Sequence, residues 1–176
     1  MNLEGRLLPE IPMTTIPISA SARKTSLALP ILVGGGIAGL LDMTSAYISF
    51  GRYMPIGIAG GIVGAAGRHR SVGQYILGLC IHYFIAFSAA AVYCLVSKKQ
   101  DFLREHFIVC GIVYGIVFFL FMQLVVLPLS AYHAMGPYQY RGLVQGLLAH
   151  IFLIGLPISI SLRTLSRSRV QHLDSN

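Results

Sequence analysis

The sequence predicts an all-α membrane protein, a four-transmembrane-helix bundle with a short interfacial or re-entrant helix in its first outer loop. Three observations support this fold class. Only 11% of the 176 residues are charged and 55% are hydrophobic, whereas soluble domains carry about 25% charged residues. The mean hydropathy is +0.72. Four apolar stretches each approach the roughly 20 residues that a helix needs to cross a bilayer.

The four spans are separated by short polar connections. They are predicted at residues 27–49, 74–96, 107–127 and 142–162. Pro30 falls in the first turn of the first span, where a helix tolerates proline. Pro128 is expected to end the third span, and Pro157 to kink the last turns of the fourth.

The first outer loop contains the apolar segment "PIGIAGGIVGAAG", residues 55–67. It is too short to span a bilayer, but its isoleucines and valine would face water in an extended loop. Its glycines recur four residues apart, a spacing that allows helices to approach closely. We therefore expect a short helix against the outer end of the bundle.

Domain organisation and orientation follow from the charges. Residues 1–26 are predicted as a flexible cytoplasmic tail, because prolines interrupt any signal-peptide core. Residues 27–162 form the transmembrane domain, and residues 163–176 a basic cytoplasmic tail. Nine Lys and Arg lie in the tails and the second loop, against four on the other side. The positive-inside rule thus predicts that both termini are cytoplasmic. Lysines and arginines placed between spans favour contact with anionic headgroups and exclude nucleic acid as a partner.

A layer of polar side chains is predicted inside the bundle. Asp42, in "GLLDMTSAY", shares a helix face with small residues, so it is expected to point into the bundle. At 1.5 Å per residue, Asp42, His82 and His150 lie about 3–6 Å to the outer side of their span midpoints, and Gln123 about 9 Å. An ionisable group at this depth needs a partner. We therefore predict a buried polar layer in which Asp42 accepts a hydrogen bond from His82 or His150.

Glycines with helical spacing mark the faces along which the spans are expected to pack. These helix-packing glycines are Gly35, Gly39, Gly111, Gly115, Gly142 and Gly146.

Four roles for the polar layer remain open. It could fix helix register, or it could form a path for protons or a small solute. It could hold haem b or a divalent metal through His82 and His150, with Asp42 as a third ligand. Asp42, His82 and Ser45 superficially resemble a catalytic triad, but no GxSxG-type element accompanies them. The sequence therefore predicts no enzyme, no catalytic residues and, apart from the haem or metal alternative, no cofactor.

Four stretches of the chain resemble a group of small bacterial inner-membrane proteins without an assigned activity, and more distantly the YagU type of inner-membrane protein. The stretches are "GGGIAGLLDMTSAY", "LGLCIHYFIAFSAAAVYCLVSKK", "CGIVYGIVFFLFMQLVVLPLSA" and "HIFLIGLPISI". The resemblance covers roughly residues 30–162 and implies a bacterial inner membrane and a four-helix layout. Asp42, His82 and His150 stand where that group carries the same residue types.

Taken together, these patterns favour a multi-pass protein of the bacterial inner (cytoplasmic) membrane, of accessory or transport type, whose polar layer fixes helix packing or relays protons. The alternative is a haem- or metal-binding membrane redox subunit that uses His82 and His150. The expected partners are the lipid bilayer and either further copies of the chain or a larger membrane complex.

Overall fold

The computed structural model describes residues 27–64, 70–131, 133 and 139–171, and within these ranges the regular structure is entirely helical. Four helical stretches are long and apolar enough to cross a membrane. The predicted fold class is therefore confirmed. The predicted amino-terminal tail, the end of the carboxy-terminal tail and the last residues of the 55–67 segment lie outside the described residues.

The spans agree closely with the predicted ranges, except at the carboxyl ends of the third and fourth. The first span is α1 and the second is α3. The third span consists of α5, the π-helical segment η1 and α6, and the fourth of α7, the π-helical segment η2 and α8. Their bounds are α1 Ala28–Phe50, α3 Val72–Val96, α5 Phe107–Phe121, η1 Met122–Val126, α6 Leu127–Leu129, α7 Tyr140–Ala149, η2 His150–Gly155 and α8 Leu156–Gln171.

Two short helices lie in the connections. The helix expected in the first outer loop is present as α2, Met54–Val63, and α4, Phe102–Glu105, joins α3 to α5. Gly51 and Gly64 end α1 and α2 with φ angles of 86° and 74°. Glycine adopts such angles without steric cost. The chain therefore reverses sharply after α1, and α2 packs back along α3.

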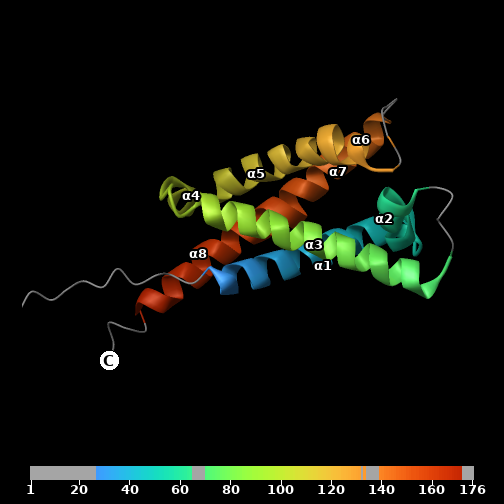
Figure 1. Ribbon diagram of the computed structural model, residues 1–176. Helices are drawn as coiled ribbons and strands as arrows, with labels where there is room; N and C mark the ends of the chain where they lie inside the picture. Colours follow the sequence, from blue (N-terminus) through green and yellow to red (C-terminus); the bar gives the residue numbers. More distant parts are fainter. Residues whose placement is uncertain (1–26, 65–69, 132, 134–138, 172–176) are drawn as a thin grey trace, which may run out of the picture.

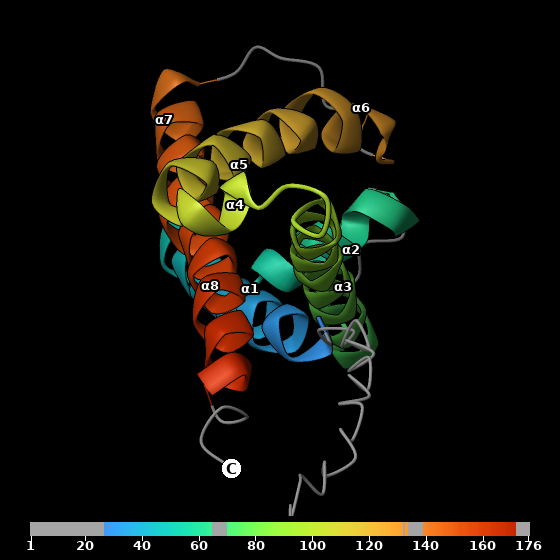
Figure 2. The same ribbon diagram turned by 90° about the vertical axis from the view of Figure 1, so that its left-hand side faces the viewer.

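The bundle is built around α1, which packs against α3 on one side and against η2 and α8 on the other. The third span lies along the fourth, and its helix α5 packs against both η2 and α8. Figures 1 and 2 show the start of α1, the end of α8 and the helix α4 at one end of the molecule, with α2 and α6 at the opposite end. Because the number of spans is even, the first span starts and the last span ends at the same end of the molecule.

The tightly packed half of the bundle is the half next to α4. Its buried cluster joins α1, α3 and the fourth span, with Tyr93, Cys94 and Ile158 nearly inaccessible. Tyr114 of α5 stacks edge-on with Tyr93 at 5.0 Å between ring centroids, and its hydroxyl donates to the Ala89 carbonyl at 2.7 Å. These contacts join α3 and α5 at this end of the bundle.

The fourth span continues past Leu162 into the segment predicted as a basic tail. Arg163 Nη1 donates to the carbonyls of Arg104 and Glu105 at 2.8 and 3.0 Å, and its guanidinium lies 4.5 Å from the centre of the Phe107 ring. Arg163, the first basic residue after the apolar stretch, thus donates to backbone carbonyls at the end of α4, and α8 continues through it.

Candidate functional site

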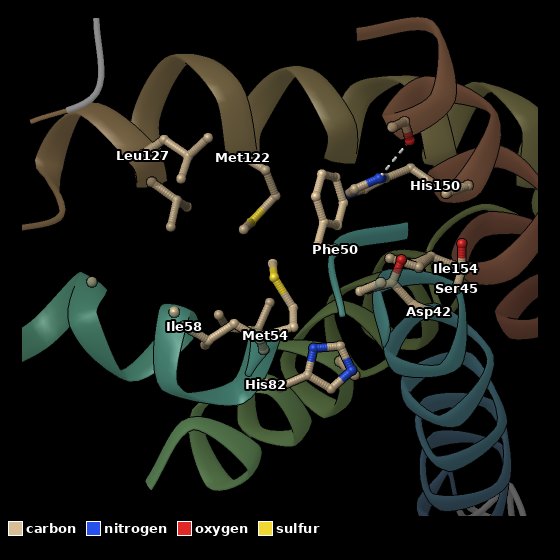
Figure 3. A pocket seen from close by; sticks show the side chains of 18 of the residues that line it. Asp42, Ser45, Phe50, Met54, Ile58, His82, Met122, Leu127, His150 and Ile154 are labelled. Atoms are coloured by element: carbon tan, nitrogen blue, oxygen red, sulfur yellow. Dashed lines mark hydrogen bonds between the residues drawn. The ribbon is translucent and has the colours of Figure 1, made fainter. Parts of the chain in front are cut away.

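The half of the bundle remote from α4 encloses a cavity of about 530 Å³. Its lining comes from α1, α2, α3, the third span and the α7–η2 part of the fourth (Figure 3). Most of the lining is apolar, and polar groups are few. They are Asp42, Ser45, Ser49, His82, Gln123, Ser130, Gln145 and His150. All four side chains of the predicted polar layer therefore border one space.

The cavity lies where α3 and α5 run apart with distance from α4 (Figure 1), while α2 packs beside α3 at the opposite end. A side chain at Gly78 would collide with the backbone of Pro55, with a Cβ only 3.0 Å from the Pro55 Cα. This close approach seats the start of α2 on α3. The space between α2 and the third span is left to the cavity.

Two widened helical turns border the same cavity. The π-helical segments η1 and η2 each end two residues before a proline, Pro128 and Pro157. A proline lacks the backbone N–H and its ring displaces the carbonyl four residues earlier, which favours a wider turn with bonds to the fifth residue. Leu127 and Leu156 indeed donate to the carbonyls of Met122 and Ile151. The kink expected at Pro157 is thus a local widening of the helix.

Asp42 corrects the prediction of a buried layer. The residue is half-buried and lies in the cavity lining. In the described part of the chain no hydrogen bond or ion pair reaches its carboxylate. The predicted bond from His82 or His150 is therefore wrong. The physical reason is that both histidines donate to backbone carbonyls instead, those of Gly39 and Gly146.

His82 is the one buried member of the predicted layer, with 9% of its surface exposed. Its Nε2 donates to the Gly39 carbonyl of α1 at 2.8 Å, and its ring contacts Tyr83 edge-on. Gly39 precedes Asp42 by one helical turn. His82 therefore bonds to the backbone of α1, the helix that carries Asp42, and not to the side chain of Asp42.

His150 is half-buried at the start of η2. Its Nδ1 donates to the Gly146 carbonyl of its own helix at 2.8 Å (Figure 3), and its ring lies 5.9 Å from Phe118 and 5.4 Å from Phe119. Both histidines thus donate to the carbonyl of a glycine, an acceptor that no side chain shields.

Gln123 is half-buried and projects from the widened turn η1 into the cavity lining. Sequence reasoning missed Gln145 as a member of this site. Its Nε2 donates to the hydroxyl of Ser49, which joins α7 to α1 across the lining. The position of Gln145 in the sequence could have indicated this, because the residue lies one turn after Gly142 in the outer third of its span.

The glycines place the helices in close contact at five of the six expected positions. A Cβ at Gly35 would lie 2.6 Å from Phe87, at Gly39 2.9 Å from Tyr83, and at Gly115 2.6 Å from the His150 carbonyl oxygen. Gly111 faces Ser159 and Gly155, and Gly146 faces Phe119.

Gly142 differs from these five glycines. Nothing lies within 4 Å of its Cβ position, because it borders the cavity. Gly34, Gly78 and Gly155 make close contacts that the sequence analysis did not single out.

A metal held jointly by His82, His150 and Asp42 finds no matching geometry. Among the described residues, no three His, Cys, Asp or Glu side chains are placed to share a metal ion. The one buried histidine has its Nε2 committed to the Gly39 carbonyl. His82, His150 and Asp42 border the same cavity without forming a ligand set.

The fold and the cavity together define the class of the protein: a multi-pass helical membrane protein with four spans and a cavity in one half of the bundle. No family model, curated protein or solved structure matches the chain. The resemblance to small bacterial inner-membrane proteins therefore stays a prediction.

Proposed function

We propose that this protein binds a small amphipathic molecule within the membrane, as the binding step of a transport or accessory role. The observation that carries the proposal is the cavity of about 530 Å³, bordered by spans on several sides. Ligand sites typically measure about 300–1,000 Å³ and combine apolar walls with a few polar groups. Both the size and the lining of this cavity match that description.

Access from the bilayer supports the proposal. A shallower, more open groove runs between α1 and the fourth span and includes Tyr140, Val144 and Phe152. Ser45, Gln145 and Ala149 belong both to this groove and to the cavity lining. An amphipathic molecule dissolved in lipid therefore has a continuous surface that leads to the cavity.

A helix-packing role for part of the site rests on a separate observation. The bond from His82 to the Gly39 carbonyl ties α3 to α1 inside the bundle. We propose that His82 fixes this helix pair while the groups around Asp42 face the ligand. The proposal further places the protein in a bacterial inner membrane with cytoplasmic termini, supported by the distribution of Lys and Arg.

The binding proposal is tested by filling the cavity. Gly142 and Gly36 both have nothing within 4 Å of their Cβ positions, but only Gly142 borders the cavity. Gly142→Leu should therefore occupy cavity space without a clash, and Gly36→Leu is the matched control. The readout is the fluorescence of the neutral probe N-phenyl-1-naphthylamine with protein in lipid nanodiscs, after subtraction of empty discs.

We expect saturable probe binding with the unsubstituted protein and with Gly36→Leu, and its loss with Gly142→Leu. Helical circular dichroism of each variant checks the fold. Saturable binding that is equal in all three proteins, or absent from all three, would contradict the proposal.

A further inference from the structure

We propose that the molecule bound in the cavity is a lipophilic organic cation, an amine or onium ion with apolar substituents, and that the Asp42 carboxylate is its counter-charge. This inference rests on the proposed function and names the chemical class of its ligand.

The first step is the isolation of the carboxylate. Asp42 is the only acidic residue in the four spans of the sequence. The two partners that the sequence predicted for it are bonded elsewhere, His82 to the Gly39 carbonyl and His150 to the Gly146 carbonyl. A charge in a membrane interior normally has a partner. Within the described chain that partner is missing, and a bound cation would supply it.

The second step is the charge of the lining. No lysine or arginine is among the described residues that border the cavity. Of the nearest basic residues along α1 and the fourth span, Arg52 contacts the hydroxyl and ring of Tyr53 and does not line the cavity. Arg141 borders the groove that leads to the cavity, but not the cavity itself. A negative ligand would therefore meet a carboxylate without a compensating cation. A positive ligand would gain a charge partner in a medium of low dielectric.

The third step is the character of the remaining surface. Phe50 and Phe118 present aromatic rings, and Met54 and Met122 extend toward one another from α2 and η1 across the cavity (Figure 3). Aromatic faces attract cations, and thioethers are polarizable and adapt their shape to a ligand. These groups suit the apolar substituents of a cation. Asp42 and Ser45 border the cavity from α1 (Figure 3), where Asp42 would meet its charge.

The test compares two ions of nearly the same shape and opposite charge, tetraphenylphosphonium and tetraphenylborate. Each is titrated separately by calorimetry into nanodiscs that hold the full chain, with empty discs subtracted. The variants are Asp42→Asn, Asp42→Glu and the matched control Asp101→Asn. Asp101 precedes α4 and does not line the cavity.

We expect the protein to bind the phosphonium more tightly than the borate. Asp42→Asn should weaken phosphonium binding by about tenfold or more, the scale of one charge pair at short range. Asp42→Glu should retain most of the affinity, and Asp101→Asn all of it. The neutral naphthylamine probe should still bind to Asp42→Asn, which shows that the cavity of this variant is intact.

The outcomes separate the two proposals. Naphthylamine binding without a preference for phosphonium, or with phosphonium affinity unchanged in Asp42→Asn, overturns the cation inference and leaves the binding cavity in place. Failure of all three probes to bind overturns both proposals.

Discussion

At the scale of single residues, the two histidines of the cavity lining donate to backbone oxygens, and the carboxylate of Asp42 is left facing the cavity. His82 and His150 each bond to a glycine carbonyl, on a neighbouring helix in one case and on its own helix in the other. Membrane hydrogen bonds contribute modestly, about 0.6 kcal/mol on average. His82 is the more buried of the two histidines and the only one that joins two spans.

His82→Ala should therefore lower stability more than His150→Ala. We expect a loss of about 1 kcal/mol from the missing bond and the vacated space, and a melting temperature lower by about 2–4 °C. The measurement is thermal unfolding in detergent, followed by circular dichroism. His82→Gln keeps a donor and serves as the control. Equal losses for both alanine variants would show that the bond to Gly39 does not hold the helix pair.

A double-mutant cycle distinguishes the observed site from the predicted one. Because the carboxylate of Asp42 and the ring of His82 share no hydrogen bond, the effects of Asp42→Asn and His82→Ala on the free energy of unfolding should add to within about 0.5 kcal/mol. A larger coupling would restore the predicted Asp–His bond.

At the scale of elements, the positions of the spans were predictable, because bilayer thickness sets the length of an apolar helix. The short helix after Gly51 was predictable for a different reason, because its apolar segment is too short to span a bilayer and its glycines recur four residues apart. The depths of Asp42, His82 and His150 along their helices were also sufficient to predict that the three residues lie in one region of the bundle. Depth along a helix does not define which carbonyl a side chain reaches, so the partners of both histidines could not be predicted.

The cavity could not be predicted from the sequence for a related reason. It depends on the divergence of α3 and α5 and on the widened turns before Pro128 and Pro157, which are properties of packed helices. The same limit explains Gly142. Its spacing relative to Gly146 indicated close packing, but only the three-dimensional arrangement shows which glycine of such a pair meets a neighbouring helix.

Helix packing gives a direct prediction for α5. Gly115→Ala would place a methyl group 2.6 Å from the His150 carbonyl oxygen, where backbone atoms have to move apart. Overpacking of this kind costs about 1–3 kcal/mol. Gly142→Ala, with nothing within 4 Å, should be neutral. Melting temperatures of the two variants in the same detergent provide the comparison, and equal values would exclude the observed contact between α5 and η2.

At the scale of the whole molecule, four spans bring the start of α1 and the end of α8 to the same end as α4 (Figure 1). The orientation is a prediction from the excess of Lys and Arg on that side. Phosphatase and fluorescent-protein reporters fused at residue 176 and, separately, after Gly64 should give opposite signals, with the carboxy-terminal fusion cytoplasmic. Phosphatase activity from the fusion at residue 176 would reverse the orientation of the whole bundle.

At the end of the bundle remote from α4, a backbone hydrogen bond runs between described residues of α2 and of the turn after α6, from the amide of Ala131 to the carbonyl of Gly61 at 2.8 Å. Gly61 and Ser130 both border the cavity. A Cβ at Gly61 would lie 3.7 Å from that of Ser130, which is within the range for a disulfide, about 3.5–4.5 Å. Cysteines at both positions, in a chain with Cys80, Cys94 and Cys110 changed to alanine, should therefore form a reducible cross-link.

This cross-link separates two routes to the cavity. One route is the groove between α1 and the fourth span, through which the proposed function expects ligand to enter from the bilayer. The other would be an opening between α2 and the end of α6, which the cross-link closes. Because the groove is not affected by the cross-link, the naphthylamine probe should leave at the same rate under oxidising and reducing conditions. A rate that falls on oxidation and recovers on reduction would place the route between α2 and α6, whereas an unchanged rate means that the bilayer itself is the reservoir from which the protein fills.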